Sequence, residues 1–229
     1  MPNQRRPRSS EPPTVTTAQK ARAKRILQAL RKRYPDAHCE LTYTTAHELL
    51  VATILSAQST DRAVNKVTPT LFSAFPSPLD YAKTTPEKIQ PLIKTIGLFR
   101  NKAKSIHASM TRIQEVFDGQ VPNNMQDLLT LRGVARKTAN VVLGNAYDIN
   151  VGVVVDTHVS RLANRFNLSQ QSRPDLIEQD LMALFRRDDW TDLSHLLIFH
   201  GRQVCKARGA TCRDDAICKH YCSNASSSC

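Results

Sequence analysis

The segment LRGVARKTANVVLG, residues 131–144, constrains the fold of this chain more than any other stretch. Gly133 permits backbone conformations that a side chain would block, and residues 135–143 have the composition of a buried helix. Residues 125–131 carry apolar side chains at helical spacing, so a short amphipathic helix leads into the glycine. The segment therefore predicts a helix, a glycine hairpin and a second helix, over residues 125–146.

A hairpin of this kind directs unpaired backbone N–H groups toward one point beside a helix N-terminus. The partial positive charge there favours an anion, and a nucleic-acid phosphate is the obvious candidate in a basic protein. Lys137 lies in the first turn of the second helix. Because this end of a helix disfavours an ammonium, and burial disfavours it further, the position favours a neutral, nucleophilic amine. The alternative is a solvated lysine or a simple phosphate contact.

The net charge of +12 and the isoelectric point near 9.7 indicate a polyanionic partner, and the lack of acidic blocks favours nucleic acid. No apolar run approaches the roughly 20 residues that span a bilayer, and the N-terminus lacks the apolar core of a signal peptide. We therefore expect a cytoplasmic protein without membrane contact, associated with the nucleoid in a bacterium. Residues 1–16, rich in Pro, Ser and Arg, predict a flexible basic arm.

Apolar side chains recur at helical spacing through the rest of the chain. The pattern predicts helices over 17–34, 45–55, 86–96, 106–117, 174–185 and 193–199. Asp61 is expected to cap a further helix, and residues 77–85 are expected to form a connection. Gly97 is expected to stop the helix that precedes it. No segment alternates as a strand, so the chain is predicted to be all-α.

Asp156 follows residues 151–155, which we interpret as a buried connector although their β-branched content is also typical of a strand. The next helix has an apolar stripe at Val159, Leu162, Ala163 and Phe166. An aspartate before such a stripe is typical of an N-cap, whose carboxylate accepts backbone N–H groups. Capping and catalysis are compatible roles, because a capping carboxylate can also face a cleft.

Five of the six cysteines lie in the last 25 residues, and only Cys39 lies elsewhere. The first four of the five have the spacing C-x6-C-x5-C-x3-C and are Cys205, Cys212, Cys218 and Cys222. In a chain without an export signal, such crowding favours a shared metal over disulfides. Thiolates alone fit either zinc or an iron–sulfur cluster.

The string LRGVARKTANVVLG, followed by VVVDTHVSRLANR at residues 153–165, closely resembles the endonuclease III family of helix-hairpin-helix DNA glycosylases. In that family the lysine after the hairpin is the covalent nucleophile and the aspartate of V-D-T-H is its catalytic partner. The resemblance implies these roles for Lys137 and Asp156. The family's L-P-G-V-G here carries Arg132 and Ala135 in place of the proline and the second glycine. Alanine tolerates a left-handed backbone less well, so a weaker or differently shaped phosphate contact is expected there.

The resemblance also implies contacts with DNA. Gln58 of the string SAQSTD matches a glutamine that fills the gap left by a damaged base. Leu98 of IGLFRNKAKSI matches a leucine that wedges beside the unpaired base. An apolar residue after a helix-ending glycine also commonly packs against the turn, which is the alternative for Leu98. The hairpin residues expected to contact DNA are Gly133, Val134, Ala135 and Arg136.

The fold implied by the resemblance is all-α with two lobes. A barrel of six helices would comprise residues 42–149 and contain the helix-hairpin-helix. Residues 17–41 and 150–229 would together form a discontinuous iron–sulfur cluster lobe. Periodicity predicts only the helices, so this arrangement is an implication of the resemblance.

One [4Fe-4S] cluster is implied for the second lobe, with the ligands Cys205, Cys212, Cys218 and Cys222. The family's usual spacing is C-x6-C-x2-C-x5-C, so Asp215 and Tyr221 stand at its third and fourth ligand positions and the loop must be rearranged. Bound zinc or loss of the cluster are the alternatives. Cys39 and Cys229 are expected to take no part. Basic residues around the ligands could contact phosphate: Lys206, Arg208, Arg213 and Lys219.

The function implied is a bifunctional DNA glycosylase and AP lyase of base excision repair, which removes oxidised pyrimidines through a lysine Schiff base. Its partner would be double-stranded DNA containing damaged pyrimidines or abasic sites, and we expect a monomer. A non-catalytic helix-hairpin-helix DNA-binding protein is one alternative, which would need neither Lys137 nor Asp156. An adenine-type monofunctional glycosylase is another, which would lack the nucleophilic lysine. A metal-dependent nuclease would need a carboxylate cluster, which the sequence does not offer.

Overall fold

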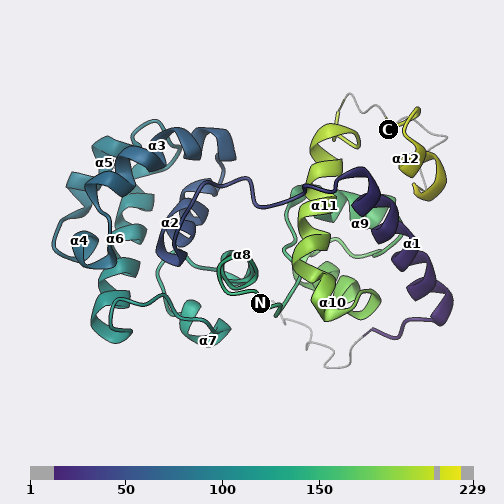
Figure 1. Ribbon diagram of the computed structural model, residues 1–229, viewed down its shortest axis with the longest axis horizontal. Helices are drawn as coiled ribbons and strands as arrows, with labels where there is room; N and C mark the ends of the chain where they lie inside the picture. Colours follow the sequence, from purple (N-terminus) through teal and green to yellow (C-terminus); the bar gives the residue numbers. More distant parts are fainter. Residues whose placement is uncertain (1–12, 209–211, 223–229) are drawn as a thin grey trace, which may run out of the picture. The chain divides into compact units, whose positions relative to one another are not determined.

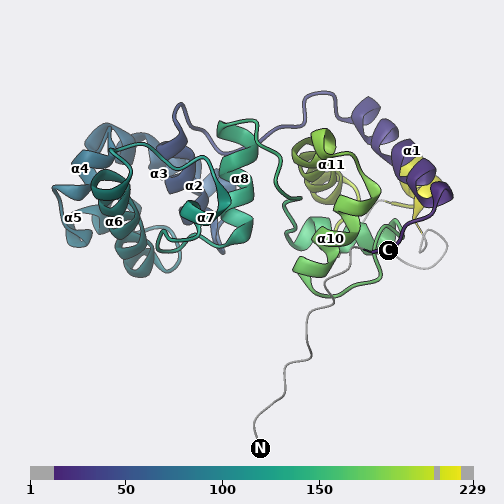
Figure 2. The ribbon, with the colours of Figure 1, turned by 90° about the horizontal axis from the view of Figure 1, so that it is seen from below.

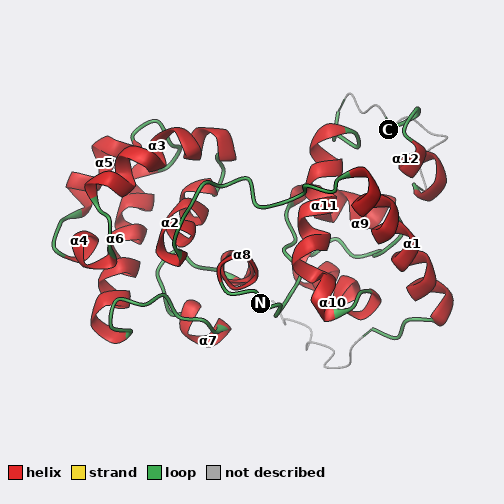
Figure 3. Ribbon diagram, viewed as in Figure 1, coloured by secondary structure: helices red, strands yellow, loops and turns green. Residues whose placement is uncertain are grey.

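The computed structural model describes residues 13–208 and 212–222. Over these residues it contains helices and loops and no strand, so the predicted all-α fold class is confirmed (Figure 3). The chain divides into two compact units, one drawn in blue to teal-green and the other in purple together with green to yellow (Figure 1). The central unit runs from Asp36 to Val154, and the terminal unit combines the residues up to Pro35 with those from Val155 onward.

The central unit is built around α2, Ala46–Ser56. Residues 49–55 of this helix are all buried. A helix that is buried on every side needs apolar side chains all round, and LLVATIL provides them at every position but Thr53. The hydroxyl of Thr53 donates to the carbonyl of Leu49 at 2.7 Å, so it is satisfied within the helix. Three further helices pack against α2 (Figure 2): α3 (Asp61–Ala74), α6 (Phe99–Val116) and α8 (Arg136–Ala146).

Three shorter helices belong to the same unit: α4 (Pro78–Ala82), α5 (Pro86–Ile93) and α7 (Met125–Leu128). The expectation that residues 77–85 form only a connection is therefore wrong. Pro78 occupies the first turn of α4, where its fixed φ angle suits a helix. The carboxylate of Asp80 accepts the backbone N–H of Ser77 at 3.0 Å, which caps the helix.

The predicted end of α5 is also wrong. The helix ends at Ile93, before Gly97 is reached. The N–H of Ile96 donates to the carbonyl of Ile93 at 2.9 Å, so a tight turn replaces the last predicted helical residues.

The sequence predicted Asp61 as the N-cap of α3, but the N-cap is Thr60. The hydroxyl oxygen of Thr60 accepts the N–H of Ala63 at 3.2 Å. Asp61 is the first residue of the helix, where its negative charge complements the helix dipole instead of capping it.

The terminal unit pairs α1, Thr17–Arg33, with helices from the far end of the chain. These are α9 (Thr157–Arg165), α10 (Pro174–Leu184), α11 (Trp190–Gln203) and α12 (Ala216–Tyr221), with the 3-10 helix η1 (Arg187–Asp189) before α11. α11 contacts both α1 and α9. α1 also lies beside α12, so elements from opposite ends of the sequence are neighbours (Figures 1 and 2).

Hydrogen bonds between residues far apart in sequence connect the parts of the terminal unit. The guanidinium of Arg22 in α1 donates to the carbonyl of Phe166 and, at 2.8 Å, to that of Tyr221. Arg31 forms ion pairs with Asp189 at 2.7 Å and with Asp192 at 2.6 Å.

Across the described ranges, no helix has the length and apolar character needed to cross a membrane.

Candidate functional site

The predicted helix-hairpin-helix is confirmed. α7 ends at Leu128, three residues before the predicted end of the first helix, and two turns follow. The N–H of Leu131 donates to the carbonyl of Leu128 at 3.1 Å, and the N–H of Val134 donates to that of Leu131 at 3.2 Å. α8 begins at Arg136 and contacts α7. The turns thus bring the chain directly to the N-terminus of α8.

Gly133 is required at its position for two independent reasons. Its φ angle is +82°, in the left-handed region that favours glycine. A Cβ atom at this position would also lie 2.9 Å from the Cβ of Ser105 in α6. The neighbouring carbonyl of Arg132 accepts the hydroxyl of Ser109 at 2.7 Å, which fixes the hairpin against α6.

Ala135 does not have the left-handed backbone that the missing family glycine suggested. Its φ and ψ angles are −101° and 171°, an extended conformation that any residue adopts. The expectation that alanine impairs the hairpin here is therefore wrong in its physical basis. Ala135 is the N-cap of α8 and supplies no side-chain acceptor to the first helical turn. Ala135 and Arg136 are exposed, whereas Val134 is buried.

Lys137 is the second residue of α8, and its side chain is exposed. The position at the N-terminal turn agrees with the sequence prediction. The hairpin places Lys137 on the surface because the apolar face of α8 begins later, at Ala139 and Val142, which pack into the core. An exposed amine at this point can meet a large substrate without any rearrangement of the helix.

Asp156 is the N-cap of α9, as predicted. Its Oδ1 atom accepts the N–H of Val159 at 2.8 Å, and the side chain is only partly buried. The preceding segment has no regular structure, and Val153 to Val155 are buried, which confirms the predicted connector. Lys137 belongs to the central unit and Asp156 to the terminal unit.

Gln58 and Leu98 lie on neighbouring loops of the central unit. Both side chains are exposed, and both residues have left-handed φ angles, of 55° and 58°. Gln58 follows α2, and Leu98 directly precedes α6. A Cβ atom on Gly97 would lie 3.9 Å from the carbonyl oxygen of Gln58, so the two loops are adjacent. Leu98 is 57% exposed, which excludes the alternative that it packs against the turn.

Three of the four predicted ligand cysteines converge. The Sγ atoms of Cys205, Cys212 and Cys218 lie within 4.8 Å of one another, and all three residues are buried. Cys222 is buried at the C-terminal end of α12 but lies outside this group of three. Asp215, at the family's usual third ligand position, caps α12 by accepting the N–H of Cys218 at 3.0 Å. The fit of the thiols to a thiolate-bound metal therefore rests on three converging sulfurs and a fourth cysteine nearby in sequence.

Two polar side chains that the sequence did not single out contact this thiol cluster. His200 of α11 has its Nε2 atom 3.2 Å from the Sγ of Cys218 and its Nδ1 atom 2.9 Å from the hydroxyl of Tyr34. Arg165 of α9 donates to the Sγ of Cys205 at 3.0 Å. The only signal for these roles was the proximity of His200 to the cysteines in sequence, since Arg165 lies 40 residues away.

The environment of the cluster favours one thiolate. The hydrogen bond from Cys218, assisted by Arg165, lowers the pKa of Cys205 to about 6. The same contact raises the pKa of Cys218 above its usual range. Burial lowers the pKa of His200 to about 4, so its imidazole is neutral at physiological pH. A thiolate with additional thiols beside it is the donor set that soft and borderline metals bind.

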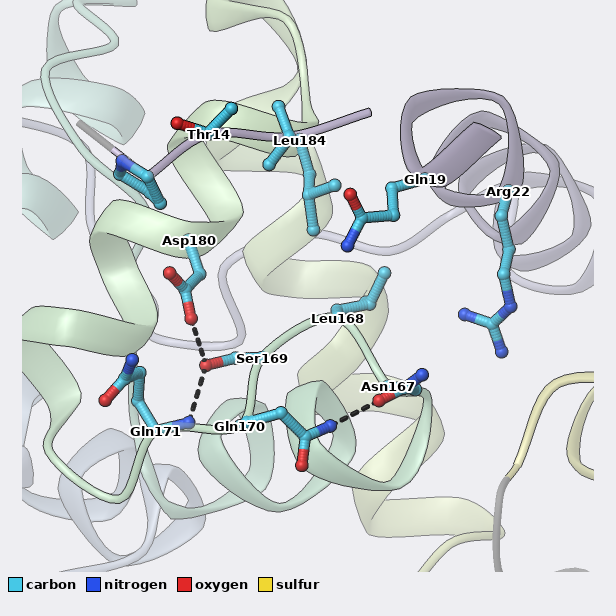
Figure 4. Close-up of a pocket in the computed structure, with 12 residues that line it drawn as sticks. Thr14, Gln19, Arg22, Asn167, Leu168, Ser169, Gln170, Gln171, Asp180 and Leu184 are labelled. Carbon is cyan, nitrogen blue, oxygen red and sulfur yellow. Dashed lines mark hydrogen bonds between the residues drawn. The ribbon is translucent and has the colours of Figure 1, made fainter. Parts of the chain in front are cut away.

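A separate pocket of about 310 Å³ lies in the terminal unit, between the start of α1 and the loop before α10 (Figure 4). In this pocket the hydroxyl of Ser169 donates to Asp180 at 2.6 Å and accepts the N–H of Gln171 at 3.1 Å. These polar groups satisfy one another, and none of the predicted site residues lines the pocket. The predicted function therefore does not involve it.

Comparisons with known proteins match residues 51–187 to the HhH-GPD superfamily of base excision DNA repair proteins. Endonuclease III of Synechocystis sp. is 50% identical over 211 residues, which cover 92% of this chain and 96% of that protein. Endonuclease III of Bacillus subtilis is 42% identical over 189 residues, which cover 82% and 86%. This chain belongs to the endonuclease III family.

Solved structures agree with this assignment to the endonuclease III family. A trapped endonuclease III–DNA covalent intermediate has a TM-score of 0.85 and 37% identity, covering 93% of this chain and 98% of that one. A thermostable thymine-DNA glycosylase, with a TM-score of 0.81 and 20% identity, shares the fold. The expected helix-hairpin-helix glycosylase fold is confirmed. So is the enzyme class, a DNA glycosylase and AP lyase of base excision repair.

Proposed function

We propose that this protein removes oxidised pyrimidines from double-stranded DNA, and cuts the strand 3′ of the resulting site, with Lys137 as the nucleophile. The observation that carries the proposal is the exposed Lys137 amine at the N-terminus of α8, immediately after the hairpin. We further propose that the protein acts as a monomer in the cytoplasm on damaged pyrimidines and abasic sites. The solved structures of endonuclease III with DNA, covalent and non-covalent, support DNA as the substrate.

The hairpin supplies the contact with the DNA backbone in this proposal. Since Ala135 offers no side-chain cap, the N–H groups at the start of α8 suit a phosphate oxygen. Arg136 is exposed at the same turn and adds positive charge. The net charge of +12 strengthens association with any duplex, independently of sequence. These contacts position the enzyme, and the lesion itself is recognised when the base leaves the stack.

Gln58 and Leu98 occupy the gap that the extruded damaged base leaves in the duplex. Their exposed side chains lie on adjacent loops, with Gln58 suited to hydrogen-bond the unpaired base and Leu98 suited to stack beside it. Extruding a nucleotide costs a few kcal/mol, less for a poorly paired damaged base. Groups that occupy the gap hold the extruded state and so favour the chemical step.

In the chemical step the Nζ atom of Lys137 forms a bond to C1′ of the sugar, and the bond from C1′ to the base breaks. The base leaves with the bonding electrons and takes up a proton. Asp156 carries a negative charge that stabilises the positive charge developing on the sugar, and it exchanges protons with the reacting groups. Loss of the amine proton and opening of the ring give a Schiff base, which acidifies the neighbouring C2′–H. Removal of that proton expels the 3′ phosphate and cuts the strand.

The cysteines hold one [4Fe-4S] cluster in this proposal, through Cys205, Cys212, Cys218 and Cys222. When bound, such a cluster would connect the end of α11 to α12 and so stabilise the terminal unit. Zinc is the competing metal, because sulfurs bound to one tetrahedral zinc lie about 4 Å apart. The Sγ atoms of Cys205 and Cys212 are 4.0 Å apart.

Borohydride trapping on a duplex that contains an oxidised thymine tests the proposal. Borohydride reduces a Schiff base to a stable amine, so the enzyme should become covalently attached to the damaged strand and not to an undamaged control. A non-catalytic DNA-binding protein would bind without being trapped. An adenine-type monofunctional glycosylase would release a base without trapping or strand cleavage. Either result would replace the proposed function.

A further inference from the structure

Lys102 is a buried lysine in the central unit that the chemistry described above does not use. It lies in the first half of α6 and is only 6% exposed. Its Nζ atom donates to the carbonyl of Leu55 at 2.8 Å and to the hydroxyl of Ser59 at 3.1 Å. Burial lowers the pKa of its amine. A lysine with only 6% exposure is unusual, because most lysines keep the charged end in water.

The polar partners of the Lys102 amine, within the part of the chain that the structure describes, are these two oxygens. Neither belongs to a carboxylate, so the buried charge has no counter-charge among the described groups. Such a group destabilises the folded state relative to an apolar side chain of similar size. Stability alone therefore does not explain why the position carries a lysine.

The two acceptors of Lys102 flank the Gln58 loop. Leu55 is near the end of α2 and Ser59 follows Gln58 directly. The side chain of Lys102 therefore fixes both ends of this loop, in which Gln58 has a left-handed φ angle of 55°.

The Leu98 loop runs directly into α6, the helix that carries Lys102. The N–H of Lys102 donates to the carbonyl of Leu98 at 3.0 Å, and Leu98 begins α6 with a left-handed φ angle of 58°. This backbone bond is a regular helical bond that fixes Leu98 to the first turn of α6, so the side-chain bonds of Lys102 connect that turn to the Gln58 loop. The approach of Gly97 to the Gln58 carbonyl brings the loops together at a second point.

We propose that Lys102 is a positioning residue that locks the Gln58 and Leu98 loops together so that both side chains enter the duplex in one motion. The proposal rests on the proposed function of those two residues. Lys102 touches no reacting atom in this scheme and acts through the loops. Its loss should therefore impair extrusion of a damaged base far more than cleavage at an abasic site, where no base has to be removed.

Lys102→Met tests this, because methionine replaces the stem and removes only the charged donor. We expect kcat/KM on an oxidised-thymine duplex to fall at least tenfold. Strand cleavage and borohydride trapping on an abasic duplex should change less than threefold. The thermal midpoint should stay equal or rise, because an uncompensated buried charge has been removed. A 2-aminopurine placed opposite the lesion should show a weaker fluorescence rise on binding, since the opened duplex is no longer held.

Lys104→Met is the matched control, because Lys104 lies on the same helix and is exposed. It should leave both substrates and the thermal midpoint unchanged. Ser59→Ala removes one acceptor without altering charge, and should lower only the oxidised-thymine rate, by a smaller factor. This second variant keeps the test valid if Lys102→Met folds poorly.

Two outcomes would overturn the proposal. Equal losses on both substrates with a lower thermal midpoint would mean that Lys102 is structural, and no change on either would mean that the loops do not need it. Failure of the proposed function would look different, because the wild-type enzyme itself would then not be trapped on either duplex.

Discussion

Single residues decide how the hairpin is built, and only some of them could be read from the sequence. Gly133 was predictable, because a glycine between two helical patterns indicates a backbone that side chains disfavour. The conformation of Ala135 was not, because it depends on where α8 starts, and a residue at the N-cap position is typically extended. The exposure of Lys137 was left open by the sequence for a related reason, since Lys137 lies only two positions before Ala139, where the buried face of α8 begins.

Gly133→Ala should destabilise the protein by about 2 kcal/mol, because it combines a strained left-handed φ angle with a Cβ contact of 2.9 Å to Ser105. Urea denaturation measures the change. Gly97→Ala is the control, since a Cβ there meets its nearest atom at an ordinary 3.9 Å, and it should change stability by less than about 1 kcal/mol. Equal effects of the two substitutions would show that Gly133 is not strained.

Asp156→Asn separates the capping role of that residue from its proposed catalytic role. Asparagine caps a helix as well as aspartate does, so the thermal midpoint should not change. The lost negative charge should slow base release about 100-fold or more. Asp156→Ala should lose about 1 kcal/mol of stability in addition, because the bond to the N–H of Val159 disappears. Wild-type base release by Asp156→Asn would leave capping as the only role.

At the scale of the helices, periodicity located the elements and failed at their ends. The stripes of α1, α6 and α9 predicted these helices, because a buried face leaves a 3.6-residue repeat in the sequence. The ends depend on local hydrogen bonds instead. Thr60 caps α3 although Asp61 has the same chemistry one residue later, and a turn at Ile93 ends α5 before Gly97. Neither the cap at Thr60 nor the turn at Ile93 produces a repeating pattern in the sequence that periodicity could detect.

The thiol cluster brings together cysteines from just after the end of α11 and from α12, so it connects these two helices. Cys218→Ser should remove most of the iron and acid-labile sulfide from the purified protein and should lower its solubility, since metal binding is coupled to folding. Cys39→Ser is the control and should retain both, because Cys39 lies in the central unit. Zinc in place of iron and sulfide would contradict the cluster, and full retention in Cys222→Ser would remove Cys222 from the ligands.

At the scale of the whole molecule, the all-α class followed from the sequence pattern, whereas the discontinuous terminal unit followed only from resemblance to a family. Its contacts explain why. Arg22 reaches the carbonyls of Phe166 and Tyr221, and Arg31 pairs with Asp189 and Asp192. These partners lie more than 140 residues apart in sequence, beyond the reach of any local pattern. The net charge, by contrast, is a property of the whole chain and indicated a nucleic-acid partner directly.

The central claim is that Lys137 forms the covalent bond to DNA, and borohydride trapping on an abasic duplex tests it most directly. The wild-type enzyme should give one covalent adduct, which peptide mapping should locate at Lys137. Lys137→Ala should bind the duplex within about threefold of wild type at fixed salt, because hairpin contacts supply the affinity, and should give neither adduct nor strand cleavage. An adduct that persists in Lys137→Ala, or that maps to another lysine in the wild type, would contradict the account.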